Sequence, residues 1–309
     1  MSINVTATQI VTFKNNMQLA LQQKRTKFGP LCLSEAASGK RHELTNLIGS
    51  VKPTRITTRH GDTQYNDTPH DRRWVVKTPA YRYADLVDDE DRLRAGIDLQ
   101  GAYTMAGAAT MARSVDQAFI EGFYGNAYTG EDGGTIVTFP GANVCPVDTG
   151  AASPTGLNIA KLRWARSTLI KNLVDLDEET ERYVALTNVQ SDNLLNEVKA
   201  TSADFVSMGG APVMESGKLK GLLGFKFVEV EYGNSSSFDN TALTLDSSNY
   251  RRVPVWCKTG MTIAEWGSMF TDVKELPDKD YSVQVYARRH LTATRTEEGK
   301  CLQLLCSEA

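Results

Sequence analysis

Residues 99–124 read LQGAYTMAGAATMARSVDQAFIEGFY, and they contain the longest helical pattern of the chain. Their apolar residues fall mostly three or four positions apart, as on one face of an α-helix. No proline interrupts the stretch, so it predicts a helix of about 26 residues, roughly 39 Å long. Its alanine and glycine residues leave one narrow face that another backbone can approach closely. We therefore expect this helix to be the longest rigid element of the protein.

Two blocks of opposite charge precede this helix. Residues 51–82 carry seven basic and three acidic side chains, whereas residues 83–98 carry six acidic and two basic ones. A self-associating protein would show this pattern if the basic block of one copy lay on the acidic block of the next. The pattern would also arise if the two blocks neutralised each other within one chain.

The basic block also contains the pattern of a long β-hairpin. Residues Thr54–His60 (TRITTRH) and Arg72–Tyr83 (RRWVVKTPAYRY) are rich in β-branched and aromatic residues, and a polar segment with glycine and proline separates them. A two-stranded ribbon has little core of its own and is marginally stable in water. The hairpin would therefore be most stable when packed against a partner surface.

The chain beyond the long helix predicts a compact α+β lobe. A second helix begins near Asn158, a buried strand at 183–187 leads into a third helix, and a further strand ends at Gly233. The apolar stripe of the second helix consists of Leu162, Ala165, Leu169 and Leu173.

The C-terminal segments alternate between apolar and polar residues, as strands do. They read YSVQVYARR, LTATR and CLQLLC, and each must pair with a strand from earlier in the chain. A mixture of helices and segregated strands predicts the α+β class.

Composition excludes several broad classes of protein. The chain has 309 residues, a mass of 34.0 kDa, a net charge of -3 and a pI near 5.9. This size predicts two connected subdomains. The chain lacks the basic excess that tight nucleic-acid binding requires. No apolar run approaches the roughly 20 residues that cross a bilayer, and the N-terminus lacks a signal-peptide pattern, so we expect a soluble protein with no membrane partner.

The five cysteines predict reduced thiols. Their number is odd and no C-x-x-C pair occurs, which argues against both a disulfide framework and a structural zinc site. They are Cys32, Cys145, Cys257, Cys301 and Cys306.

The polar segment RHGDTQYNDTPHDRRW, residues 59–74, contains two of the four histidines. His60, Asp62, His70 and Asp71 could bind zinc or manganese, but a polar loop rarely supplies the rigid placement that metal ligands need. The alternative is a solvated loop with incidental histidines. Nucleophile-elbow, zinc-hydrolase and dinucleotide-binding motifs are absent from the sequence. We therefore predict that the protein is not an enzyme and has no catalytic residue, cofactor or metal site, with a metal-dependent enzyme using His60 and His70 as a minor alternative.

The predicted elements follow one another as an extended N-terminal arm, a hairpin, an acidic stretch, a long helix, an α+β lobe and closing strands. This order resembles the tailed-bacteriophage major capsid proteins of the Hong Kong 97 type, whose parts are called N-arm, E-loop, spine helix, A-domain and P-domain. The most specific part covers residues 74–130, which are similar to the end of the E-loop, the acid-rich turn and the spine helix of that family. Residues 282–306 look like its closing P-domain strands.

The resemblance implies an α+β phage major capsid fold and a division of the chain. The expected parts are the N-terminal arm at 1–40, the E-loop β-hairpin at 41–86, the P-domain with the spine helix (about 99–124) at 87–150, the A-domain at 151–270, and the closing P-domain strands at 271–309.

The resemblance also implies a function: a structural major capsid protein that self-assembles into hexamers and pentamers of an icosahedral phage head enclosing double-stranded DNA. The E-loop would lie over a neighbouring copy, and Trp and Arg are residue types that interfaces favour. The expected E-loop contacts are Arg59, Arg72, Arg73, Trp74 and Lys77. The expected contacts of the acidic stretch are Asp88, Asp89, Glu90 and Asp91.

The implied partners are further copies of the chain, a portal, a separate scaffolding protein and, in addition, a decoration protein. Packaged DNA would be held loosely and non-specifically, because the protein is mildly acidic. The protein would reside in the virion capsid after assembly in the host cytoplasm. An encapsulin-like shell, which packages enzyme cargo instead of a genome, is the alternative function.

Overall fold

The computed structural model describes residues 24–59, 61–63, 65–87, 99–206, 214–215, 218–219, 221–230, 243 and 245–308. The chain divides into two compact units, which we describe separately. Unit 1 comprises Met1–Arg25, Ala80–Arg113 and Ser268–Arg289, and unit 2 comprises Thr26–Pro79, Ser114–Gly267 and His290–Ala309. The expectation of two subdomains is met, although neither unit is continuous in sequence.

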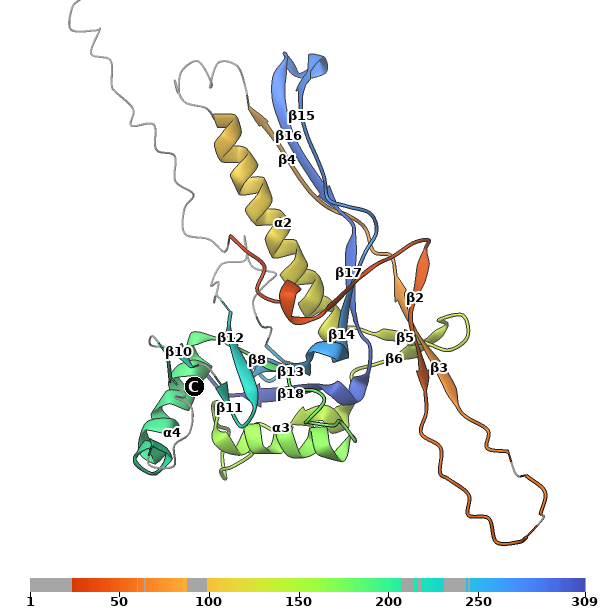
Figure 1. The fold of residues 1–309 in the computed structure, drawn as a ribbon. Helices are drawn as coiled ribbons and strands as arrows, with labels where there is room; N and C mark the ends of the chain where they lie inside the picture. Colours follow the sequence, from red (N-terminus) through yellow and green to blue (C-terminus); the bar gives the residue numbers. More distant parts are fainter. Residues whose placement is uncertain are drawn as a thin grey trace, which may run out of the picture. The chain divides into compact units, whose positions relative to one another are not determined.

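The long helix α2 runs from Leu99 to Tyr124, as the periodicity predicts (Figure 1). Its residues up to Arg113 belong to unit 1, and those from Ser114 onward belong to unit 2. In unit 2 the rings of Phe119 and Phe123 are fully buried. Phe119 stacks on Phe28, with ring centroids 4.5 Å apart. Aromatic packing therefore anchors the C-terminal part of the helix.

Unit 1 contains a three-stranded antiparallel sheet in the order β15-β16-β4. Its strands are β4 (Tyr81–Val87), β15 (Phe270–Leu276) and β16 (Ser282–Arg289). Helix α2 approaches this sheet closely at Gly107, where an added Cβ atom would lie 2.9 Å from Cδ1 of Tyr83. The small residues of α2 thus allow the close contact that the sequence predicts.

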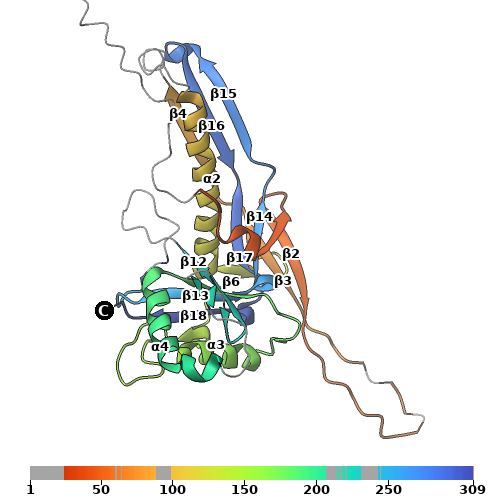
Figure 2. The same cartoon turned by 60° about the vertical axis from the view of Figure 1, so that its left-hand side comes forward.

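Unit 2 is built around a six-stranded sheet in the order β11-β12-β8-β13-β18-β7 (Figure 2). The strands are β7 (Val144–Cys145), β8 (Arg182–Leu186), β11 (Gly221–Leu222), β12 (Phe225–Glu229), β13 (Arg251–Cys257) and β18 (Cys301–Cys306). A separate two-stranded sheet pairs β9 (Met214–Glu215) with β10 (Lys218–Leu219).

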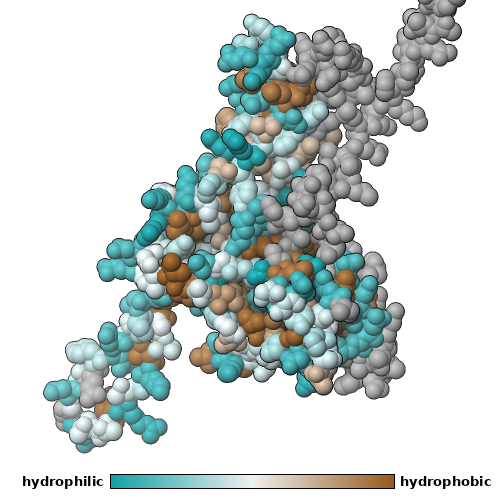
Figure 3. Space-filling view, turned by 180° about the vertical axis from the view of Figure 1, so that it is seen from behind, coloured by the Kyte–Doolittle hydropathy of each residue, from teal (hydrophilic) through white to brown (hydrophobic). Residues whose placement is uncertain are grey.

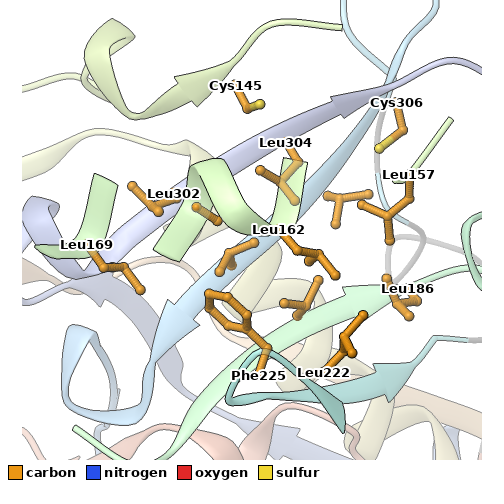
Figure 4. Packing of buried hydrophobic residues seen from close by; sticks show 14 of the residues in the cluster. Cys145, Leu157, Leu162, Leu169, Leu186, Leu222, Phe225, Leu302, Leu304 and Cys306 are labelled. Atoms are coloured by element: carbon orange, nitrogen blue, oxygen red, sulfur yellow. The ribbon is translucent and has the colours of Figure 1, made fainter. Parts of the chain in front are cut away.

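Two helices pack on one face of the six-stranded sheet. They are α3 (Ile159–Lys171) and α4 (Asn188–Val206), and both contribute to one apolar cluster. Figure 4 shows Leu162 of α3 facing Leu302 and Leu304 of β18 in this cluster. The opposite face presents Trp256, whose ring centroid lies 5.0 Å from that of Phe119 in α2.

The lobe confirms most of the sequence predictions for its elements. Helix α3 begins after Asn158, whose side chain accepts a hydrogen bond from the Lys161 backbone and caps the helix. The predicted core positions of α3 up to Leu169 are buried. Leu173 is an exception: it lies beyond the helix end with φ 62° and 88% exposure. The predicted strand end at Gly233 lies outside the described residues.

The closing strands pair with earlier strands, but in three different sheets. β16 pairs with β4, and β18 pairs with β13. β17 (Leu291–Arg295) pairs with β14 (Met261–Glu265), which also pairs in parallel with β1 (Leu33–Ala36). The range 271–309 therefore does not form one block of strands.

The hairpin differs from the prediction in both arms. Its strands are β2 (Arg41–Ile48) and β3 (His70–Val76), and the four-stranded sheet continues through β5 (Ala127–Thr129) and β6 (Thr135–Val137). The prediction of a strand at Thr54–His60 is wrong, because residues 54–59 belong to no strand and His60 lies outside the described residues. Pro69, which directly precedes β3, has no N–H group for the ladder, which is one reason why pairing stops after Ile48↔His70.

The second predicted arm is two strands. It breaks at Thr78 and Pro79, between β3 and β4, and β4 pairs with β16 in unit 1. The expected E-loop range of 41–86 therefore includes strands from two different sheets.

Candidate intersubunit contact site

The loop at the end of the β2–β3 hairpin is the most exposed segment among the described residues of unit 2. We call residues 49–69 the distal loop. It is closed by a hydrogen bond of 2.8 Å from the Gly49 N–H group to the Pro69 carbonyl oxygen. Beyond this bond the described residues form no ladder, and none of them is buried. The loop therefore owes its fold to few contacts within the chain.

Two large apolar side chains of the distal loop are almost fully exposed to solvent. Ile56 is 91% exposed and Tyr65 is 92% exposed. The remaining surface of the loop is mostly hydrophilic, as the lower left of Figure 3 shows. The free energy falls when a partner surface covers apolar side chains of this size.

Three of the predicted contact residues carry exposed cationic side chains. Arg59 lies in the distal loop, Arg72 on β3 and Lys77 directly after β3. The Arg72 Nε atom lies 3.7 Å from Glu43 Oε1, and both side chains are well exposed, at 43% and 38%. An exposed pair of this kind contributes at most about 1 kcal/mol. These cations are therefore accessible to a partner.

Arg73 has a role within its own chain. Its side chain is 3% exposed and donates two hydrogen bonds to Glu298, from Nη1 at 2.9 Å and from Nη2 at 2.6 Å. The Arg73 Nε atom donates to the Thr296 carbonyl oxygen at 3.0 Å. The contact of Arg73 with a neighbouring copy stays a prediction, and in the structure all three nitrogen atoms of its guanidinium group donate a hydrogen bond within the subunit.

Trp74 is also engaged within the subunit. Its Nε1 atom donates to the Gly130 carbonyl oxygen at 2.8 Å, and a Cβ atom on Gly133 would lie 2.8 Å from the Trp74 ring. Gly133 has φ +67°, a conformation that favours glycine. Arg73 and Trp74 thus fix the base of the hairpin, which leaves the exposed cations as the better candidates for contact.

Sequence reasoning missed the partners of Arg73. Strand periodicity could have placed Arg73 on the buried face, because it lies two positions before the apolar Val75. Glu298 and Arg295 gave no signal, since they are remote in sequence and stand in a short polar turn and a strand, respectively. Arg295 is fully buried, and its Nη1 atom donates to the carbonyl oxygen of Gly125 at 2.6 Å.

The acidic stretch Asp88, Asp89, Glu90 and Asp91 lies outside the described residues, as does His60. His70, the first residue of β3, is exposed. Within the described residues, no group of three or more His, Cys, Asp or Glu side chains could hold a metal ion. No helix in the described part of the chain is long and apolar enough to cross a membrane.

The five cysteines are free and buried. Burial raises the pKa of the Cys32, Cys257 and Cys306 thiols to about 12. At neutral pH these groups are protonated thiols and not nucleophilic thiolates. The prediction of reduced thiols is confirmed.

Solved phage capsid structures share this fold over almost the whole chain. The capsid of cyanophage P-SCSP1u is 15% identical, with a TM-score of 0.72, and the match covers 100% of this chain and 96% of that one. The head of the Helicobacter pylori bacteriophage KHP40 is 11% identical, with a TM-score of 0.69 and 100% coverage of both chains. The capsid of cyanophage Pam1 is 12% identical, with a TM-score of 0.68 and 98% coverage of both chains.

The sequence itself matches the phage capsid protein family over residues 5–308. The chain therefore belongs to this family, and it is a structural major capsid protein of the phage virion and not an enzyme. No curated protein matches the sequence. Neither the encapsulin-like shell nor the metal-dependent enzyme gains support from these comparisons.

Proposed function

We propose that copies of this chain assemble, as in the Hong Kong 97 type, into hexamers and pentamers of an icosahedral head that encloses double-stranded DNA. The distal loop of one copy lies on the surface of a neighbouring copy. The observation that carries this proposal is the exposure of the loop, where Ile56 and Tyr65 are more than nine-tenths exposed. A shell that joins each subunit to several neighbours becomes strong through many moderate contacts.

Charge supports a neighbour as the partner of this loop. Arg59, Arg72 and Lys77 are exposed cations, and the following acidic stretch at 88–91 supplies four carboxylates of opposite charge. We assign these two sets as contacts between neighbouring copies. Opposite charges on two surfaces speed encounter and fix the register of docking.

The proposal extends to the parts of the chain and its further partners. We assign the N-terminal arm, E-loop, spine helix, A-domain and P-domain to the ranges expected from the sequence, except that the E-loop hairpin ends at Val76 and that β18 goes with the six-stranded sheet. A portal, a separate scaffolding protein and a decoration protein are the further partners, and assembly takes place in the host cytoplasm. DNA is held loosely, because a net charge of -3 provides little attraction for phosphate.

The test is negative-stain electron microscopy with sedimentation velocity on the purified chain and on the Arg72→Glu variant. We expect closed shells, or rings of five and six, from the natural chain. Arg72→Glu should leave a folded subunit by circular dichroism that fails to assemble, because its new charge faces a neighbour's carboxylates. Arg166→Glu reverses an exposed charge on α3 and serves as a control for the charge change alone.

Two results would count against the proposal. Normal shells from Arg72→Glu would show that Arg72 is not needed for the contact between copies. A natural chain that stays monomeric at high concentration, even when co-expressed with candidate scaffolding proteins, would contradict self-assembly through the distal loop.

A further inference from the structure

Three charged side chains meet at the base of the hairpin in unit 2. Arg73 comes from β3, Arg295 from β17, and Glu298 from the turn between β17 and β18. Glu298 receives the two hydrogen bonds of Arg73, and its Oε1 atom also lies 3.9 Å from Arg295 Nε. One carboxylate is therefore shared between two buried cations. Their side chains are 3% and 0% exposed, against 19% for Glu298.

Arg295 links this carboxylate to the end of α2. Its Nη1 atom donates to the carbonyl oxygens of Phe123 at 2.5 Å and Gly125 at 2.6 Å. These carbonyl groups lie at the C-terminus of α2, where the helix dipole is negative and a cation is stabilised. The second positive charge of the cluster thus has partners of its own.

Other side-chain hydrogen bonds of the hairpin run to the β5–β6 turn and not to the end of α2: Trp74 donates to the Gly130 carbonyl oxygen at 2.8 Å, and Arg41 Nη1 donates to the Asp132 carbonyl oxygen at 2.7 Å. The ladder between β3 and β5 consists of two residue pairs, Arg73↔Thr129 and Trp74↔Tyr128. Val75 packs against Ala264 and Trp266, but apolar contacts are not directional. A planar guanidinium group that binds a carboxylate through two parallel hydrogen bonds fixes both distance and orientation.

We propose that Glu298 and Arg73 are positioning residues for assembly: their two-bond pair, held against Arg295 at the end of α2, sets the direction in which the hairpin leaves the subunit. The inference rests on the proposed function, in which the distal loop reaches a neighbouring copy. A loop at the end of two strands amplifies any change of angle at its base. A subunit with a loosened base therefore presents its loop in many directions, and productive contacts become rare.

The test separates the geometry of the pair from its charge. Arg73→Lys keeps the positive charge but replaces the planar fork by a single ammonium group. Glu298→Asp keeps the negative charge but withdraws the carboxylate by one methylene. Arg163→Lys makes the same chemical change at an exposed position of α3 and is the matched control. Circular dichroism first establishes that each variant is folded.

Hydrogen exchange of the backbone amides in β2 and β3 is the decisive measurement. We expect Arg73→Lys and Glu298→Asp each to raise exchange there at least tenfold, while exchange in β8 and β13 stays unchanged. Electron microscopy should show open or irregular assemblies from both variants and normal shells from Arg163→Lys. Two variants are needed because either alone could fail to fold.

Either of two outcomes would overturn the inference. Unchanged exchange in the hairpin of both variants would show that the pair does not hold the base. A loosened hairpin that still gives normal shells would show that its direction does not matter for assembly. These outcomes differ from a failure of the proposed function. Normal shells from Arg72→Glu would argue against the loop contact, but they would not change the hydrogen exchange measured in β2 and β3.

Discussion

Glu308 shows how single ionic contacts fasten the last strand of unit 2. Its two carboxylate oxygens accept hydrogen bonds from Nε and Nη2 of Arg251, each at 2.7 Å. Gln190 of α4 adds a third hydrogen bond at 2.9 Å. The side chains of Arg251 and Glu308 are 6% and 19% exposed, so solvent screens this pair only weakly. The hydrogen bonds from Arg251 hold the pKa of Glu308 below its ordinary value of 4.5.

This pair predicts an acid-dependent loss of stability. Because the folded state lowers the pKa of Glu308, its contribution to the free energy of unfolding is complete above pH 4.5 and is lost as the pH falls through the folded pKa. Glu308→Gln should cost about 1.5–3 kcal/mol at neutral pH, the range for hydrogen bonds to charged groups. Urea unfolding of both proteins, from pH 7 to about pH 3, should show this difference shrinking toward zero.

An exposed carboxylate provides the control for this prediction. Glu178→Gln should change the free energy of unfolding by less than about 0.5 kcal/mol at every pH. A loss in Glu308→Gln that stays constant with pH would show that shape and not charge supplies the stability.

At the scale of single residues, the sequence identified the chemistry of the hairpin but not its partners. Arg72 and Lys77 are cationic and exposed, as a contact with a neighbouring copy requires. The partner of Arg73 stands 225 positions later in the chain, at Glu298. No local pattern connects residues so far apart, so the sequence could not distinguish a contact between copies from one within a copy.

At the scale of elements, periodicity predicted α2 well because its apolar face is repeated over about seven turns, with no proline. The hairpin arm at Thr54–His60 was wrong for a different reason. β-branched residues favour a strand only where a partner strand provides a ladder, and residues 54–59 have none. Propensity therefore indicated the hairpin but misplaced its first strand, which is Arg41–Ile48, by about 12 residues.

The close contact between α2 and β17 gives a prediction at this scale. A Cβ atom on Gly122 would lie 2.2 Å from the carbonyl oxygen of Ala293 and 2.5 Å from its carbonyl carbon. Alanine raises helix propensity by about 1 kcal/mol, but here backbone must move to admit it. We expect Gly122→Ala to lower the free energy of urea unfolding by about 1–3 kcal/mol, as overpacking does.

Gly107→Ala is the matched change in the same helix. Its nearest neighbour is the ring of Tyr83, a half-buried side chain that can rotate away. We expect its effect to remain under about 1 kcal/mol, because the gain in helix propensity offsets the shift of the ring. If both variants changed the free energy of unfolding equally, the backbone of β17 would move to admit a methyl group as readily as the Tyr83 side chain does.

At the scale of the whole molecule, the stability of the lobe and the contacts of the distal loop depend on different residues. The folded lobe draws its stability from a buried apolar cluster and from buried ion pairs within the chain. The distal loop contributes little to either, because none of its described residues is buried. A protein with this division can lose its contacts to neighbours without losing its fold.

Removing the distal loop tests this division directly. Residues 50–68 would be replaced by Asn-Gly, a two-residue connection that suits an antiparallel pair, so that the hydrogen bond between Gly49 and Pro69 is retained. We expect the free energy of unfolding of the shortened subunit to lie within about 0.5 kcal/mol of that of the natural chain, as for changes at exposed positions. Electron microscopy and sedimentation velocity should nevertheless show no shells.

The double variant Ile56→Ser and Tyr65→Ser keeps the length of the loop and removes only its two exposed apolar side chains. If those side chains anchor the loop on a neighbour, this variant should also fail to assemble, whereas shells from it would assign the contact to the cations and the backbone. Normal shells from the shortened subunit would exclude the loop from assembly altogether, because no residue of the loop would remain to make the contact.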